Sequence, residues 1–236
     1  MQRYFSNQKI DGNYVLSEED NYHIKKVMRM EIGDKIEIVD NFHPFICEII
    51  SLDPVKAKVI SEIMEDNELE TKVIIVQSLV NENKMDYILQ KSTELGAFGF
   101  YAFNATNSVI KMNEKKDKKI LRWQKIVKEA SEQSKRNFIP KVYDILSIKE
   151  LCNLKADLKI LLTVNEKTKN IKKIVHKRKK CDTIIIVVGP EGGFTNSEEK
   201  FLMENGFIST SLGKRVLRTE TASVAILSML NYEWMV

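Results

Sequence analysis

The sequence predicts an α/β protein in which a small β-rich domain precedes a larger domain, built as a parallel sheet with helices on both faces. Up to about residue 65, apolar and polar residues alternate with a period of two, which is typical of half-buried strands. From residue 71 onward, short apolar runs alternate with helical patterns, as they do in parallel sheets. We therefore predict two domains, residues 1–70 and 71–236.

The first domain is expected to be a small barrel with one helix. Ser17, with Asp20 three residues later, is a capping pattern for that helix. The buried stripe of the helix would consist of Ile24, Val27 and Met28. Strands are predicted at 14–16, 35–39, 45–50 and 57–61, and the acidic residues 65–70 are typical of a linker.

The second domain is expected to alternate strands and helices. Its strands are predicted at 73–79, 98–103, 159–164, 183–188 and 209–212. Its helices are predicted at 84–95, 117–136, 148–154, 167–180, 197–204 and 220–234. The run at 183–188 is continuous and β-branched, which indicates a strand buried on both faces. Gly96 is expected to end the helix at 84–95.

Two loops stand out after these strands. Residues 189–193 (GPEGG) follow the strand at 183–188, and Thr195 with Glu198 forms a capping box for the next helix. Residues 212–222 (LGKRVLRTETA) lead into the apolar C-terminal helix. Open α/β sheets bind ligands at the carboxyl ends of their strands, although many glycine turns only reverse the chain. The phosphate-binding patterns GxGxxG and GxxxxGK[ST] are absent from the sequence.

The net charge of +4 hides an asymmetry between the predicted domains. Residues 1–70 carry 8 Lys and Arg against 15 Asp and Glu, a net charge of −7, which leaves +11 for residues 71–236. Basic residues concentrate at 111–128 and at 167–180. These blocks are either solvated helix faces or a surface for a phosphate backbone, and the sequence leaves both open.

The remaining composition indicates a cytoplasmic globular protein. No apolar stretch reaches the roughly 18 residues that a membrane span needs, and no signal peptide is indicated. Cys47, Cys152 and Cys181 are odd in number and widely spaced, so we expect reduced thiols and no metal site.

Five segments, in order along the chain, carry a family resemblance. They are residues 23–29 (HIKKVMR), 84–96 (KMDYILQKSTELG), 122–136, 189–194 (GPEGGF) with Glu198, and 212–222. Together they resemble the RsmE family of SPOUT-superfamily methyltransferases, which methylate N3 of a uridine in 16S ribosomal RNA of the small subunit. The resemblance covers nearly the whole chain.

The resemblance implies a PUA-like RNA-binding domain, a C-terminal trefoil knot and a homodimer. It also implies S-adenosyl-L-methionine as the cofactor, bound among three loops. The cofactor-binding candidates are Leu162, Thr163, Gly189, Pro190, Glu191, Gly192, Gly193, Leu212, Gly213, Val216, Leu217, Arg218, Thr219, Thr221 and Ala222. The final helix could form part of the dimer interface, or its residues Ile226, Leu227, Leu230 and Trp234 could belong to the core of one chain.

Methylation of uracil N3 requires loss of its proton and stabilisation of the negative charge that develops on O2 and O4. Arg215 and Arg218 suit that charge, because arginine is always protonated and donates bidentately. Glu191 is a candidate proton acceptor or an orienting partner for Arg218, and a structural role is the favoured reading. The RNA-binding candidates are Arg3, Lys25, Arg29, Lys111, Arg122 and Arg136, the last two expected on one helix face with Glu129 and Gln133.

One position departs from the family pattern. Asn107 stands where the family usually has an arginine, so a charge is lost there while hydrogen bonding is kept. Two alternative functions stay open: a SPOUT ribose 2′-O RNA methyltransferase, and a non-catalytic RNA-binding dimer.

Overall fold

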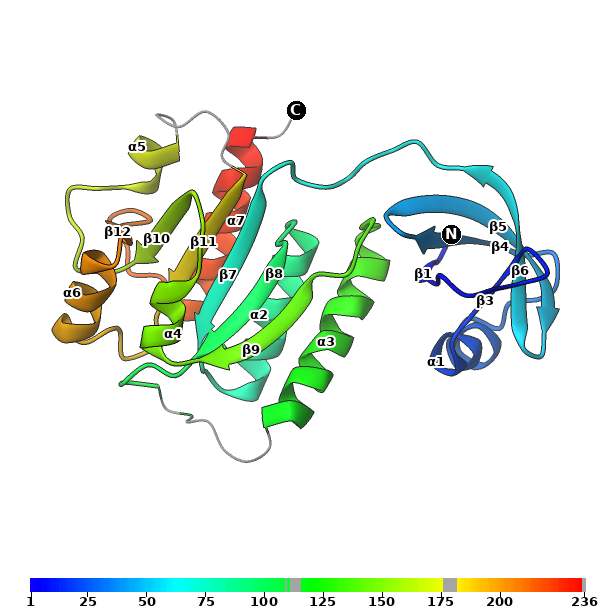
Figure 1. The fold of residues 1–236 in the computed structure, drawn as a ribbon, viewed down its shortest axis with the longest axis horizontal. Coiled ribbons are helices and arrows are strands. Elements are labelled where there is room, and N and C mark those ends of the chain that lie inside the picture. The colour runs from blue at the N-terminus through cyan, green and yellow to red at the C-terminus, as the bar shows by residue number, and fades with distance from the viewer. Residues whose placement is uncertain (109, 111–115, 176–181, 235–236) are drawn as a thin grey trace. The chain divides into compact units, whose positions relative to one another are not determined.

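A computed structural model describes residues 1–108, 110, 116–175 and 182–234. Its contacts divide the chain into two compact units (Figure 1). The first comprises Met1–Glu68 together with Ser131–Ile139, and the second comprises Leu69–Ala130 together with Pro140–Val236. The segment Ser131–Ile139 therefore belongs to a unit from which it is distant in sequence.

The first unit is a six-stranded half-barrel. Its strands are β1 (Arg3–Phe5), β2 (Lys9–Ile10), β3 (Asn13–Val15), β4 (Lys35–Asp40), β5 (His43–Leu52) and β6 (Val55–Glu62). Their order in the sheet is β1-β4-β5-β6-β3-β2, with β1 parallel to β4 and the other pairs antiparallel. Asn41 and Phe42 take left-handed φ values of 47° and 71°, as the two-residue turn between β4 and β5 requires.

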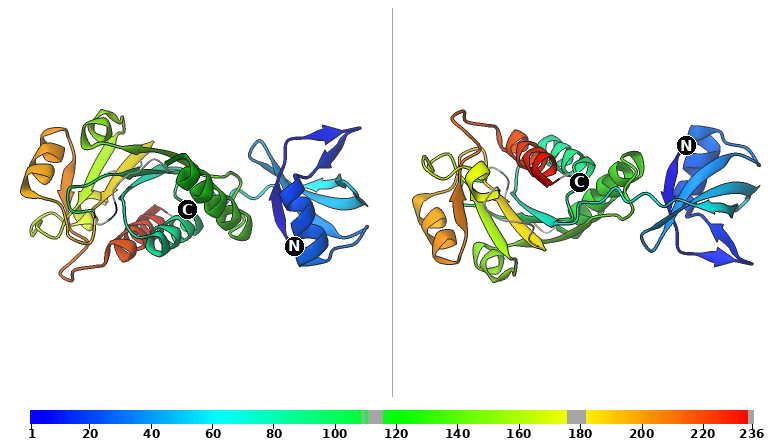
Figure 2. Two further views of the ribbon diagram at one scale, coloured as in Figure 1. Left: turned by 90° about the horizontal axis from the view of Figure 1, so that it is seen from below. Right: turned by 90° about the horizontal axis from the view of Figure 1, so that it is seen from above.

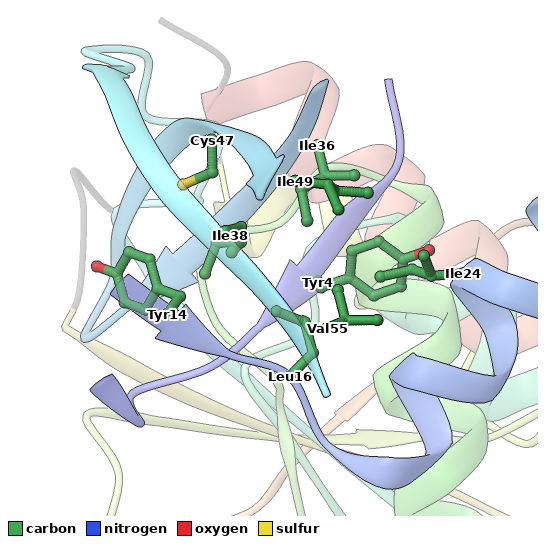
Figure 3. Packing of buried hydrophobic residues seen from close by; sticks show 10 residues of the cluster. Tyr4, Tyr14, Leu16, Ile24, Ile36, Ile38, Cys47, Ile49 and Val55 are labelled. Atoms are coloured by element: carbon green, nitrogen blue, oxygen red, sulfur yellow. The ribbon is translucent and has the colours of Figure 1, made fainter. Parts of the chain in front are cut away.

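Apolar side chains from the strands of this sheet and from the helical segment after β3 pack together as the core of the unit (Figure 3). The cluster is almost entirely inaccessible to solvent and consists of Tyr4, Tyr14, Leu16, Ile24, Ile36, Ile38, Cys47, Ile49, Val55 and Ala57. The hydroxyl of Tyr4 lies 3.0 Å from His23 Nδ1, and the hydroxyl of Tyr14 donates to Asp40 Oδ2 at 3.0 Å, so both tyrosine hydroxyls are satisfied. Burial raises the pKa of the Cys47 thiol to about 12, which makes this cysteine an unreactive part of the core.

The predicted helix of the first domain is confirmed at its start and differs at its end. Helix α1 (Glu18–Tyr22) begins at Ser17, whose hydroxyl accepts the N–H of Asp20 at 3.2 Å, and continues as a π-helical segment, η1 (His23–Met28). The predicted apolar stripe is wrong for Val27 and Met28, which are 57% and 45% exposed, whereas Ile24 is buried. The wider π turn shifts later residues around the axis, so the spacing of 3.6 residues no longer applies.

The second unit contains a fully parallel sheet, as predicted. Its strands are β7 (Lys72–Ser78), β8 (Gly99–Phe103), β9 (Lys141–Leu146), β10 (Leu158–Leu162), β11 (Thr183–Val188) and β12 (Ile208–Thr210). They are arranged in the order β12-β10-β11-β7-β8-β9. Strand β9 was missing from the sequence prediction. It is an edge strand, and its exposed Lys141 and Asp144 interrupt the apolar pattern.

Helices cover both faces of this sheet (Figures 1 and 2). Helices α2 (Glu82–Glu94), α3 (Lys116–Gln133) and α7 (Thr219–Trp234) lie on one face. Helices α4 (Ile148–Asn153) and α6 (Asn196–Glu204) lie on the other, where Leu151 and Leu202 join the core. Gly96 ends α2 as predicted, with φ +86° and a bond from Ala97 N to Ser92 O of 2.9 Å.

Two features of the second unit answer questions that the sequence left open. Ile226, Leu227 and Leu230 on α7 are inaccessible within one chain, so they belong to its core. Helix α5 (Ile171–Val175) starts later than predicted, and residues 176–180 of the predicted helix lie outside the described residues.

In the part of the chain that the structure describes, no helix is long and apolar enough to cross a membrane, and no cluster of His, Cys, Asp or Glu could hold a metal ion.

Candidate functional site

The three loops predicted from the sequence begin side by side at one edge of the parallel sheet. Leu162, the last residue of β10, pairs with Val188 of β11 and with Thr210 of β12. Val188 in turn pairs with Gln77 near the end of β7. The chain runs from β7 to β8 and β9 on one side, while β10, β11 and β12 lie on the other. This edge is therefore a topological switch point, where open α/β sheets form their ligand sites.

A buried chain of hydrogen bonds joins the glycine loop, residues 189–193, to the start of α7. The hydroxyl of Thr219 donates to Gly189 O at 2.7 Å, and Gln77 Nε2 donates to the Thr219 hydroxyl at 2.9 Å. The Ser223 hydroxyl donates to Gln77 Oε1 at 2.9 Å. Because all three polar side chains are buried and bonded, they fix the bases of the two loops relative to the sheet.

The glycines of the loop at 189–193 meet specific steric demands. A Cβ on Gly189 would lie 2.7 Å from the ring of Phe194, and Gly193 has φ +68°. A Cβ on Gly192 would lie 3.1 Å from the Cβ of Asn107. Asn107 Nδ2 lies 3.3 Å from Gly192 O and 3.1 Å from Gly193 O, so the residue that departs from the family pattern binds the glycine loop directly.

Two adjacent carboxylates in the first turn of α6 hold two further loops. The predicted capping box is present: Glu198 accepts the Thr195 N–H at 2.9 Å, and it also accepts the Thr106 N–H at 2.7 Å. Burial acts to raise the pKa of Glu198, but the hydrogen bonds from Thr195 and Thr106 outweigh it and the pKa is lowered. Glu199 accepts hydrogen bonds from the Thr163 hydroxyl and from Asn165, which holds the loop after β10.

The acidic candidate Glu191 is paired with a lysine that sequence reasoning missed. Lys84 Nζ, in the first turn of α2, lies 2.5 Å from Glu191 Oε1 and 3.6 Å from Glu220 Oε2. The contact between Glu191 and Arg218, which was one of the roles considered for Glu191, is not formed among the described residues. The hydrogen bond to Glu191 and the charge of Glu220 raise the pKa of Lys84. One sequence signal was available, because a cation in the first turn of a helix opposes the helix dipole and so calls for an acidic partner.

Arg215 and Arg218 lie in the loop that follows β12, and both are exposed. Neither forms an ion pair with a carboxylate among the described residues. Val216 in the same loop is 78% exposed, and Gly213 has φ +134°. This loop therefore presents free positive charge beside the switch point, while contacts of its residues with a cofactor remain a prediction.

The structure overturns two of the predicted RNA contacts. Arg3 and Arg136 are each only 3% exposed. The guanidinium of Arg3 donates to Glu37 at 2.8 Å, to Lys135 O at 2.7 Å and to Asn137 Oδ1 at 2.8 Å. These bonds tie β1 and β4 to the segment Ser131–Ile139, so the guanidinium serves contacts inside the unit.

Arg136 lies beyond the helix on which it was predicted. Helix α3 ends at Gln133, Lys135 takes a left-handed φ of 61°, and the N–H of Arg136 donates to Ser131 O at 3.0 Å. The side chain then pairs with Glu68 at 2.5 Å, so it does not share a face with Arg122.

The other RNA-binding candidates stay predictions. Arg122 pairs with Glu82 at 2.9 Å and with Asp86, both on α2. Lys25 lies 3.4 Å from Asp53, and Arg29 is exposed at the end of η1. Lys111 lies outside the described residues.

Comparison with known proteins places the chain in a family. Residues 67–231 match the RNA methyltransferase domain, and residues 16–60 match the RNA methyltransferase PUA domain. The chain is 40% identical to the ribosomal RNA small subunit methyltransferase E of Bacillus subtilis, over 99% of this chain and 97% of that protein. The chain belongs to the ribosomal RNA small subunit methyltransferase E family.

Solved structures of the family share the whole fold. The ribosomal RNA small subunit methyltransferase E of Neisseria gonorrhoeae, bound to S-adenosyl methionine, is 29% identical with a TM-score of 0.89, covering 99% of this chain and 98% of that one. A methyltransferase of Legionella pneumophila, in complex with the same cofactor, is 28% identical with a TM-score of 0.87, covering 98% and 96% of the two chains. Both units of the chain are thus matched by proteins that bind this cofactor.

Proposed function

We propose that the chain is an S-adenosyl-L-methionine-dependent methyltransferase that methylates N3 of a uridine in 16S ribosomal RNA. The convergence of three loops at one switch point carries the proposal. Thr219, from the loop after β12, bonds directly to Gly189 of the loop after β11. Family membership supports the reaction class and the ribosomal RNA substrate.

The residues at this edge suit a cofactor that carries a sulfonium, an ammonium group and hydroxyls. Glu220 Oε2 is buried and lies 3.6 Å from Lys84 Nζ, so its charge is already compensated within the chain. Gly189 and Gly192 let Phe194 and Asn107 pack against the loop, and at Gly193 the space where a Cβ would lie is open. We propose that main-chain groups of 189–193 and 212–222, with Leu162 and Thr163, hold the cofactor, which supplies an activated methyl group when bound.

The exposed loop arginines suit the anionic character of the methylated base. When the N3 proton leaves uracil, negative charge spreads onto O2 and O4, and fixed guanidinium groups stabilise it. Arg215 and Arg218 have no carboxylate partner among the described residues to neutralise them. Glu191 Oε1 is engaged by Lys84 Nζ at 2.5 Å, so this oxygen is not free to contact the base. We therefore assign the proton to solvent.

The proposal includes a homodimer and a knotted C-terminal segment. Helix α7 leaves Met229 and Tyr232 39% and 86% exposed, beside a hollow of about 630 Å³ that also borders Leu212 and Val175. A second copy covering this apolar face would remove it from water, which is the usual reason for such a patch. Lys25, Arg29 and Arg122 are the proposed RNA contacts among the described residues.

The test uses small ribosomal subunits that lack the modification, incubated with the protein and methyl-labelled S-adenosyl-L-methionine. We expect 3-methyluridine among the nucleosides of the product RNA. Label that is found as a ribose 2′-O-methyl group, which blocks alkaline hydrolysis at that position, would favour the alternative methyltransferase. A chain that binds RNA but neither S-adenosyl-L-methionine nor S-adenosylhomocysteine in a calorimeter would be a non-catalytic binder.

A further inference from the structure

A single ammonium group lies between carboxylates from two different loops of the candidate site. Glu191 belongs to the glycine loop after β11, and Glu220 belongs to the first turn of α7 after the arginine loop. Lys84 Nζ is 2.5 Å from the first and 3.6 Å from the second. We infer that Lys84 is a positioning residue, which sets the distance between the two loops that hold the cofactor. The inference rests on the proposed function of these loops.

The two carboxylates repel each other without this lysine. Both oxygens lie within 3.6 Å of one nitrogen, so they are at most about 6 Å apart. The side chain of Glu220 is 15% exposed, and its Oε2 accepts no hydrogen bond from a described residue. The Glu191 side chain is 42% exposed, so water screens part of this repulsion, but the largely buried charge of Glu220 would be left without its cation. Removing the ammonium would therefore push the glycine loop and the start of α7 apart.

The position of Lys84 is fixed by the capped first turn of α2. Its own N–H donates to Asn81 Oδ1 at 3.0 Å, which caps α2. The next residues on the inner face of the helix, Met85, Ile88 and Leu89, are buried. A cation at the start of a helix opposes the helix dipole, so its position there is explained by the two acids that it contacts. Both loops are therefore held by one lysine whose position is fixed by α2.

The same helix offers a matched control. Lys91 pairs with Glu94 at 2.8 Å, within one turn of α2, and among the described residues it forms no ion pair with either loop. A Lys91→Met variant removes a lysine and breaks an ion pair, as Lys84→Met does, but it leaves Glu191 and Glu220 untouched.

The experiment measures binding of S-adenosyl-L-methionine and S-adenosylhomocysteine by calorimetry, with thermal unfolding as a check on folding. We expect Lys84→Met to weaken both affinities by on the order of tenfold, because displaced binding groups lose their alignment. Lys84→Arg should keep most of the affinity, since it keeps the charge. The double variant Lys84→Met/Glu220→Gln should recover much of the loss, because it removes the repulsion; a merely structural lysine would show no such recovery.

Two results would overturn the inference, and they are distinguishable. In the first, the wild-type chain binds the ligands, but Lys84→Met binds them as tightly as Lys91→Met does, or adding Glu220→Gln to Lys84→Met restores no affinity. Lys84 then does not set the distance between the loops, and the proposed function is unaffected. In the second, the wild-type chain binds neither S-adenosyl-L-methionine nor S-adenosylhomocysteine. The proposed function is then wrong, and the inference about Lys84 is wrong as well.

Discussion

Two arginines of the first unit, Arg3 and Arg136, and the two arginines of the loop at 211–218 have opposite environments. Arg3 and Arg136 are buried, and each guanidinium donates to an acidic side chain of its own unit. Arg215 and Arg218 are exposed, with no carboxylate partner among the described residues. The sequence presented all four as charges for RNA or substrate. The difference shows that an arginine is available for a ligand only when the fold provides no acid or carbonyl for it.

The comparison predicts that the first pair serves stability and the second pair serves the reaction. Each of the following changes tests one side of that division, beginning with the largest effect.

Arg3→Met should lower the free energy of unfolding of the first unit by about 2–3 kcal/mol, because Glu37 keeps only Lys135 as a cationic partner and the carbonyls of Lys135 and Arg136 lose a charged donor. Hydrogen exchange of β1 and β4 amides in urea measures this in the full chain. Lys26→Met, at an exposed position of η1, is the control and should change stability by less than about 0.5 kcal/mol. Equal effects of the two variants would show that the Arg3 contacts contribute little.

Arg218→Ala should leave stability unchanged within about 0.5 kcal/mol and lower the rate of methyl transfer by roughly 10²-fold, since one stabilising donor is lost. Arg215→Ala should act in the same direction. Single-turnover assays with labelled cofactor measure the rate. Lys200→Ala removes an exposed lysine of α6 and should be silent. If Arg218→Ala instead unfolds the protein without slowing transfer in the folded fraction, the division between the two pairs is wrong.

Glu198→Gln should cost about 1–2 kcal/mol at neutral pH, because two loops lose a charged hydrogen-bond acceptor. The pKa of Glu198 is lowered in the folded protein, so its stabilisation is complete above pH 4.5, its ordinary value, and is lost as the pH falls below that. Thermal unfolding of wild type and variant should therefore converge in acid. Glu204→Gln on the same helix, where the acid pairs only with exposed Lys200, should show no comparable pH dependence. A constant difference across the pH range would contradict the assignment.

Asn107→Ala should have the smallest effect, about 0.5–1 kcal/mol on the local opening of residues 189–195, because its two contacts with the glycine loop are long and exposed. Hydrogen exchange of those amides reports the opening. Asn205→Ala removes an amide that bonds only within its own helix end, and it should leave the loop unchanged. Unaltered exchange at 189–195 in Asn107→Ala would show that the loop is held by Lys84 and Thr219 alone.

Local sequence signals predicted the parts of the fold that depend on neighbouring residues. Strand β11 spans the predicted residues 183–188, because a continuous apolar run and a following glycine define both of its ends. The caps at Ser17 and Thr195 were predicted for the same reason. Strand β9 was missed because an edge strand keeps polar residues on its open side, which weakens the apolar pattern.

Long-range contacts could not be predicted in this way. The acceptors of Arg3 at residues 135–137 lie more than 130 residues from it in sequence, so no spacing rule connects them. Lys84 and its two acids lie on three separate segments, and only the position of the lysine in a first helical turn gave a hint. The candidate site was therefore predicted as loops, while the contacts that hold those loops together required the structure.

The discontinuous first unit has a consequence for the order of events during synthesis. A nascent chain that has just completed the six strands of the half-barrel still lacks the carbonyls and the amide that receive Arg3, and these arrive only when residue 137 has been translated. The ribosome must make β7, β8 and all of α3 before Arg3 of the amino-terminal strand can form these bonds. A fragment that ends near residue 70 would for the same reason lack residues 131–139 of the first unit. It would therefore not be an independently folding RNA-binding domain.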